Sequence, residues 1–142
     1  MQNKYDVLKR VFGHSAFRAY QEEAVDALLA HHDVMMVLPT GAGKSLCYQL
    51  PSLVLEGISV VISPLLALMH DQVTALRAFG ISASMISSMQ DVQEIAQTMR
   101  ACEKGELKLL YVAPERLKSE AFIGFLQSLA INFFVVDEAH CV

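Results

Sequence analysis

The 142-residue sequence contains no tryptophan, few cysteines and little charge. Its three cysteines, Cys47, Cys102 and Cys141, lie far apart and form no Cys-x-x-Cys pair. This spacing argues against a disulfide scaffold and against a structural zinc site, so we expect reduced thiols and no zinc. Eleven Lys and Arg against fifteen Asp and Glu give a net charge of −4. The chain therefore lacks an overall basic footprint, and contact with nucleic acid requires a local patch.

Long hydrophobic runs are also absent. No uninterrupted apolar run reaches ~18 residues, the length that predicts a membrane span. The first six residues, Met-Gln-Asn-Lys-Tyr-Asp, lack the apolar segment of a signal peptide. We therefore expect a cytoplasmic protein with no membrane partner. Hydrophobic residues make up 54% of the sequence, which is enough for the core of one domain.

Helical and extended patterns alternate along the chain. The predicted helices cover about 4–12, 18–31, 44–55, 64–79, 91–104 and 114–130. The predicted strands cover 34–38, 58–62, 82–87, 108–112 and 133–136. Continuously apolar strands are typical of a parallel sheet with helices on both faces. In such sheets ligands bind beyond the carboxyl ends of the strands, so the residues at those ends are the candidates for function.

Three helix starts have recognisable capping signals. Ser63-Pro64 predicts a helix start, because serine caps amide groups and proline suits the first turn. Asp91 and Glu94 predict a capping box. Pro114 is expected to begin the helix that runs to about residue 130.

A glycine-rich turn follows the strand predicted at 34–38. Gly41 and Gly43 let backbone amides converge on an anion, Lys44 would reach the β- and γ-phosphates, and the Ser45 hydroxyl would bind Mg²⁺. Leu38 occupies the first glycine position of the usual pattern. A chance glycine-rich turn before a helix is the alternative, which the strand-turn-helix context disfavours. The candidate set is Thr40, Gly41, Ala42, Gly43, Lys44, Ser45 and Leu46.

Two adjacent carboxylates, Asp137 and Glu138, directly follow the last predicted strand. Asp137 would hold Mg²⁺, and Glu138 would orient or deprotonate an attacking water. Solvated turn residues are the alternative. His140 is ambiguous between a structural and a functional role.

A compact cluster precedes the first predicted strand and includes Phe12, His14, Phe17, Arg18 and Gln21. The amide of Gln21 offers a donor and an acceptor at the spacing of adenine N6 and N7. Arg18 would stack on the base or pair with a carboxylate. The alternative is that the phenylalanines belong to the core and that Gln21 is a solvated helix residue.

These segments together resemble the RecQ family of DNA helicases. Five stretches carry the resemblance in the family's order: 12–21, 38–51, 62–73, 110–117 and 137–141. They include the Leu-Cys-Tyr-Gln sequence at 46–49, which most other phosphate-loop proteins lack. The resemblance implies a truncated RecA-like phosphate-loop NTPase fold, α/β and three-layered, with a mainly parallel sheet. Residues 1–32 would form the adenine-recognition helices, and residues 33–142 would form part of the first motor lobe.

The resemblance also implies roles for particular residues. Gln21 is carried over as the adenine hydrogen-bonding residue and Arg18 as the stacking residue. His14 stands where family members often have an aromatic residue, and His140 would link the ATP site to neighbouring motifs and DNA. Segments 63–64 and 114–116 would contact the backbone of single-stranded DNA, with helix capping as the alternative.

The implied activity is that of an ATP- and Mg²⁺-dependent DNA helicase, acting 3′-to-5′ in repair and recombination. Its partners would be single-stranded or partly duplex DNA and a second motor lobe, which the 142 residues do not include. Lys44 and Glu138 would be the catalytic residues, and the chain by itself is expected to lack helicase activity. In a bacterium the protein would associate with the nucleoid. The alternatives are an RNA helicase or other phosphate-loop NTPase, and a fragment that binds nucleotide without hydrolysing it.

Overall fold

The structure is a computed structural model that describes residues 3–32, 34 and 43–136. The chain divides into two compact units, Met1–Glu56 and Gly57–Val142. The sequence-based boundary between residues 32 and 33 separates the proposed adenine-recognition helices from the proposed motor lobe. It stays a prediction. The predicted strand 34–38, apart from Val34, lies outside the described residues.

Three helices make up the described part of the first unit: α1 (Lys4–Arg10), α2 (Ala19–Leu29) and α3 (Leu46–Val54). The Asn3 side chain caps α1 by accepting a hydrogen bond from the Asp6 amide at 2.9 Å. Both α1 and α2 contact α3. Their core consists of Val7, Leu8, Val25, Leu46 and Leu50. The helices predicted in this region are therefore confirmed, with ends within a few residues of their expected places.

Charged side chains hold α1 against α2. The Lys4 ammonium pairs with Glu22 at 2.9 Å and also with Asp26. The Tyr5 hydroxyl donates to the Glu22 carboxylate, and this hydrogen bond lowers the pKa of that carboxyl. These contacts join the first turn of α1 to Glu22 and Asp26 of α2.

The second unit is built on a four-stranded parallel sheet with the order β2-β3-β1-β4. The strands are β1 (Ile58–Ile62), β2 (Ala83–Ile86), β3 (Leu109–Val112) and β4 (Ile131–Val136). Ile62 is in register with Val112 on one side and with Val136 on the other. Ile86 is in register with Val112. All four carboxyl ends therefore lie at one edge of the sheet, as the sequence predicts.

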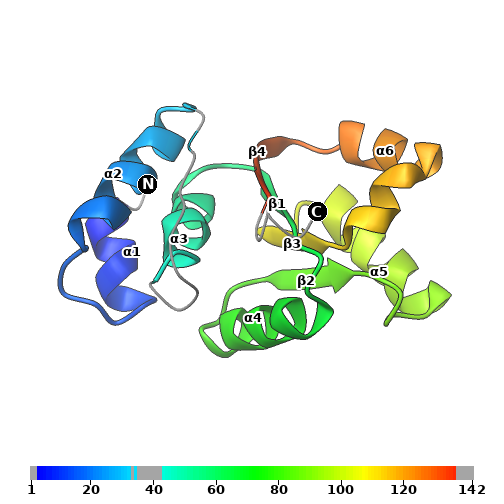
Figure 1. Ribbon diagram of the computed structural model, residues 1–142, viewed down its shortest axis with the longest axis horizontal. Helices are drawn as coiled ribbons and strands as arrows, with labels where there is room; N and C mark the ends of the chain where they lie inside the picture. Colours follow the sequence, from blue (N-terminus) through cyan, green and yellow to red (C-terminus); the bar gives the residue numbers. More distant parts are fainter. Residues whose placement is uncertain (1–2, 33, 35–42, 137–142) are drawn as a thin grey trace. The chain divides into compact units, whose positions relative to one another are not determined.

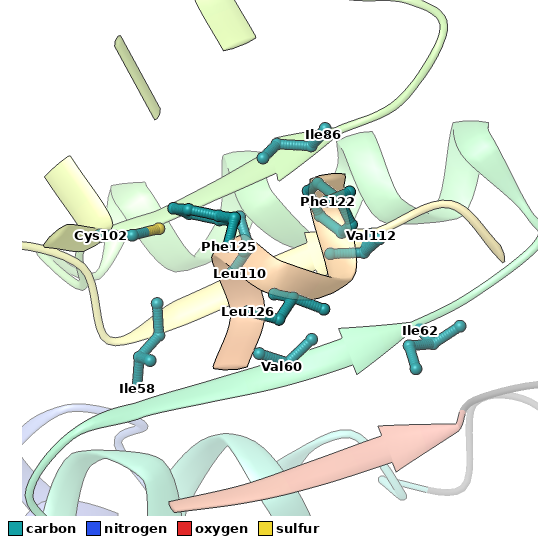
Figure 2. Packing of buried hydrophobic residues seen from close by; sticks show 10 residues of the cluster. All are labelled: Ile58, Val60, Ile62, Ile86, Cys102, Leu110, Val112, Phe122, Phe125 and Leu126. Atoms are coloured by element: carbon teal, nitrogen blue, oxygen red, sulfur yellow. The ribbon is translucent and has the colours of Figure 1, made fainter. Parts of the chain in front are cut away.

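Helices cover both faces of this sheet, which confirms the predicted α/β architecture. Helices α5 (Val92–Glu103) and α6 (Glu120–Gln127) pack on one face, where Phe122 and Phe125 meet Val60 and Leu110 (Figure 2). Helix α4 (Leu66–Ala78) lies on the opposite side of the sheet from α6 (Figure 1). The residues of α4 that are buried, Met69, Val73 and Leu76, do not belong to the cluster around Phe122.

Burial differs sharply between the central strand and its neighbour β4. Every residue of β1 is buried, because strands pair on both sides of it and helices cover the sheet. In β4, by contrast, Phe134 and Val136 are 54% and 53% exposed. Both are in register with β1 residues of the α6-covered face, Val60 and Ile62. The helical cover on that face therefore does not extend over β4.

Two predicted helix boundaries are wrong. Helix α4 begins at Leu66 and not at Ser63-Pro64, because Ser63 still belongs to the sheet: its amide donates to the Val112 carbonyl at 3.1 Å. The helix predicted from Pro114 to about residue 130 is two helices. A short 3₁₀ helix, η1 (Pro114–Lys118), is followed by α6, which the Ser119 side chain caps through the Phe122 amide at 3.2 Å.

Other local predictions are confirmed. Asp91 accepts a hydrogen bond from the Glu94 amide at 2.8 Å, and Glu94 accepts one from the Asp91 amide at 3.3 Å, forming the predicted capping box. Strand β1 has the predicted limits, while β4 begins two residues before the predicted 133.

Gly57 lies where β1 and β4 first pair. Its φ is +92°, a backbone conformation that favours glycine. A Cβ at this position would lie 2.3 Å from the Ala130 carbonyl oxygen, which accepts a hydrogen bond from the Ile58 amide. Position 57, where β1 and β4 begin to pair, therefore requires glycine for two reasons: its backbone conformation and the lack of space for a Cβ.

We predict that Gly57→Ala lowers the free energy of unfolding by about 3 kcal/mol, because it combines backbone strain with a backbone clash. Gly105→Ala is the matched control, since Gly105 also has a positive φ of +73° but a Cβ there would meet no neighbouring group within 4 Å. The control should lose only about 1 kcal/mol. Urea unfolding followed by circular dichroism measures both, and equal losses would show that the approach to Ala130 is unimportant.

Candidate functional site

Lys44 and Ser45 stand directly before α3, at the N-terminus of a helix. Ser45 is the N-cap residue, and its carbonyl accepts hydrogen bonds from the amides of Tyr48 at 3.2 Å and Gln49 at 2.9 Å. Leu46, the first helical residue, is 7% exposed and belongs to the core of the first unit. The core thus anchors the first turn of α3. The partial positive charge at a helix N-terminus favours bound anions.

Side chains from two different helices contact the carbonyl of Gly43. The Gln21 amide donates to it at 3.1 Å, and the Cys47 thiol lies 3.9 Å from it. Gly43 has a φ of +78°, and a Cβ there would lie 2.7 Å from Gln21 Nε2. The predicted need for glycine at this position therefore has two physical reasons, a left-handed backbone and a closely packed amide.

Gln21 links the start of α2 to the residue before Lys44. Its Oε1 accepts the backbone N–H of Arg18 at 2.9 Å, while its Nε2 donates to Gly43. The side chain is buried, with Gln21 only 8% exposed. The alternative that Gln21 is a solvated helix residue is therefore wrong.

Tyr20 also lies beside Gly43, although it is not among the site residues predicted from the sequence. Its hydroxyl accepts a hydrogen bond from Arg18 Nη1 at 3.2 Å. A Cβ at Gly43 would lie 3.5 Å from this hydroxyl and 3.9 Å from Arg18 Nη1. The signal in the sequence was a phenol next to the candidate Gln21, but nothing local indicated that it would reach a residue more than twenty positions away.

The rest of the N-terminal cluster has structural contacts. Phe12 and Phe17 pack against the core of the first unit, as the structural alternative predicted. Phe17 also makes an edge contact with the Tyr5 ring, with centroids 5.9 Å apart. His14 is exposed, and its amide donates to the Leu8 carbonyl at 3.1 Å.

Several predicted site residues lie outside the described residues. These are Thr40, Gly41, Ala42, Asp137, Glu138 and His140. Their roles stay predictions. In the part of the chain that the structure describes, no group of three or more His, Cys, Asp or Glu side chains is placed to hold a metal ion.

The carboxyl edge of the sheet gathers polar groups from three loops. Ser63 follows β1, and its hydroxyl accepts the Leu65 amide at 3.4 Å. Arg116, in η1 after β3, donates to the Ser87 carbonyl after β2 at 3.1 Å. Pro114 occupies the first turn of η1, as the capping alternative predicted. Contact of these segments with single-stranded DNA stays a prediction.

Comparison with known proteins shows extensive similarity to helicases. A family profile described as "DEAD/DEAH box helicase" matches residues 18–142. Two relatives named "ATP-dependent DNA helicase RecQ" are 45% and 44% identical to this chain, over 99% and 96% of it. They come from Pasteurella multocida and Bacillus subtilis. The predicted resemblance is therefore confirmed. The chain spans only 22% and 23% of the length of these relatives.

A solved structure shares the fold. The crystal structure of a hypothetical ATP-dependent RNA helicase from Sulfolobus tokodaii matches 99% of this chain with a TM-score of 0.76. The sequence identity is 22%, and the match covers 42% of that chain. This likeness supports the RecA-like fold class. Among the described residues, no helix is long and apolar enough to cross a membrane.

Burial raises the pKa of the Cys47 thiol to about 11, and the pKa of the Cys102 thiol likewise to about 11. Both residues are nearly inaccessible, at 4% and 6% exposure. The thiolate is the reactive form, so both thiols should react slowly near neutral pH.

We predict that iodoacetamide at pH 8 leaves Cys47 and Cys102 largely unmodified in the folded chain and labels them rapidly in urea. Labelling should increase only as the pH approaches 11, because a raised pKa keeps the thiols protonated below it. Mass spectrometry of the separate peptides measures each site. Labelling of Cys47 at pH 8 as fast as in urea would contradict its burial beside Gly43.

Proposed function

Since the chain belongs to the DEAD/DEAH box helicase family, we propose that it is the nucleotide-binding part of an ATP-dependent DNA helicase of the RecQ type. The observation that carries the proposal is the joining of Gln21 to Gly43, directly before Lys44. This hydrogen bond joins the side chain that we propose binds the base to the loop that we propose binds the phosphates.

The adenine base would be bound by Gln21. An amide has two N–H groups and two lone pairs, and the bonds to Gly43 and Arg18 use one of each. The remaining donor and acceptor suit the N6 and N7 edge of adenine. Arg18 would stack on the base, and His14 would lie next to it.

The phosphates would be bound by residues 40–46. The fit rests on chemistry present at the start of α3: an anion-favouring helix N-terminus, the ammonium of Lys44 and the hydroxyl of Ser45. Ser45 and Asp137 supply hard oxygen ligands, which Mg²⁺ prefers. When bound, Mg²⁺ neutralises charge on the phosphates. Glu138 would hold or deprotonate the attacking water, and Lys44 would stabilise charge on the transferred phosphoryl group.

A longer protein that contains this lobe would act on DNA together with a second motor lobe. We propose 3′-to-5′ unwinding of DNA in repair and recombination, and a cytoplasmic location, associated with the nucleoid in a bacterium. Translocation requires opening and closing of two lobes. An arginine supplied from outside a phosphate site accelerates hydrolysis by ~10³–10⁵ in related chemistry. We therefore expect the 142 residues by themselves to bind nucleotide, hydrolyse it slowly and unwind nothing.

We predict that Lys44→Ala abolishes binding of Mg·ATP to this chain and the DNA-stimulated ATPase of a full-length protein carrying it. Titration calorimetry and phosphate release measure the two effects. Lys9→Ala is the matched control, because Lys9 is an exposed lysine on α1. Unchanged ATP binding in the Lys44 variant would contradict the phosphate-loop assignment.

The identity of the nucleic acid is tested separately. A full-length protein with this lobe should unwind a DNA duplex that has a 3′ single-stranded tail and should leave a matched RNA duplex intact. Strand separation followed by gel electrophoresis measures both substrates side by side. Preferential unwinding of RNA would favour the RNA-helicase alternative while leaving the nucleotide site unaffected.

A further inference from the structure

We propose that Tyr20 is a positioning residue, which holds the Arg18 guanidinium beside Gly43 for contact with the base of the bound nucleotide. This inference rests on the proposed function. The observation behind it is that Arg18, Tyr20 and Gln21 would all lie within 4 Å of a Cβ at position 43. Three side chains from the start of one helix thus converge on the residue before Lys44.

The backbone that carries Tyr20 is firmly placed. Tyr20 is the second residue of α2, and the next residue, Gln21, is buried and bonded to Gly43. The Gln21 amide N–H also donates to the Arg18 carbonyl at 2.9 Å, while Gln21 Oε1 accepts the Arg18 amide. The backbones of residues 18 and 21 are therefore tied to each other and to Gly43. The backbone at position 20 lies between these two residues, so the phenol of Tyr20 starts from a fixed place.

Ordering Arg18 when nucleotide binds costs conformational entropy. Arg18 is exposed, and a long arginine side chain loses much conformational entropy when a ligand orders it. The phenol of Tyr20 has only two side-chain torsions and accepts Arg18 Nη1 at 3.2 Å. The hydrogen bond orders part of the guanidinium before nucleotide binds, so less entropy is lost on binding.

The direction of this hydrogen bond suits stacking on a base. N–H groups of a guanidinium donate in the plane of the group, whereas aromatic rings stack on its faces. A bond from Nη1 to the Tyr20 hydroxyl therefore uses an edge of Arg18 and no face. Tyr20 can fix the plane of the guanidinium without competing with a purine for it.

The test removes only the hydroxyl. Tyr20→Phe should weaken binding of Mg·ATP to the 142-residue chain by about fivefold, the effect of one hydrogen bond. Binding of tripolyphosphate, which has no base, should change less than about twofold. Tyr5→Phe is the matched control, because it removes a phenolic hydroxyl bonded to Glu22 in the same unit, and it should leave the ATP affinity unchanged. Titration calorimetry measures all three proteins, and thermal unfolding verifies that each is folded.

A double-mutant cycle tests whether Tyr20 affects ATP binding through Arg18. In an Arg18→Ala background, Tyr20→Phe should cause no further loss of ATP affinity, because the hydrogen bond from Arg18 is already absent. An undiminished loss in that background, or an unchanged ATP affinity in Tyr20→Phe alone, would overturn the proposal. Equal weakening of ATP and tripolyphosphate would also overturn it, since Tyr20 would then act on the phosphate loop directly. Failure of the unmodified chain to bind ATP would instead reject the proposed function.

Discussion

Parallel pairing of the strands is the constraint on which the second unit depends. Ile62, Val112 and Val136 are in register, so β1, β3 and β4 end together at one edge. The core cannot form without this register, because it places Val60 and Leu110 together under α6. The same register brings the loops after the strands to one edge of the sheet, where Arg116 already joins two of them. Residues that follow the strands are therefore neighbours even though they are distant in sequence.

In the first unit, one carbonyl group joins two helices. Gly43 O accepts the amide of Gln21 and lies within hydrogen-bonding reach of the Cys47 thiol. Through it, α2 and α3 are fixed at the point where the predicted phosphate loop ends. The hydrogen bond couples Gln21, which we propose binds the base, to the residue directly before Lys44, which we propose binds the phosphates. This coupling is a physical reason for Gln21 to be buried, although glutamine is mostly exposed in proteins.

Local patterns explain most of what the sequence predicted correctly. Strand β1 is apolar except for Ser59 and pairs with a strand on each side, and the capping box of Asp91 and Glu94 needs only four residues. The helix start at Ser63 was mispredicted because the Ser63 amide donates to the Val112 carbonyl of the sheet, and that partner is nearly fifty positions away. The break before α6 had a local signal, the Ser119 cap, which the strong start at Pro114 obscured. The sequence pattern identified Gln21 as a candidate. Its contact with Gly43, and the place of Tyr20 beside the same residue, depend on tertiary packing and could not be predicted from local sequence.

We propose that residues 44–46 and the pair Asp137–Glu138 bind one nucleotide and one metal ion. Manganese(II) replaces Mg²⁺ on the same oxygen ligands and broadens the NMR signals of nearby amides. The most direct measurement is therefore paramagnetic relaxation in the ¹⁵N-labelled chain with Mn·ATP, compared with Mg·ATP. The account predicts strong broadening of the amides of Lys44 to Leu46 and of Asp137 and Glu138 alike. Broadening of one group without the other would contradict it.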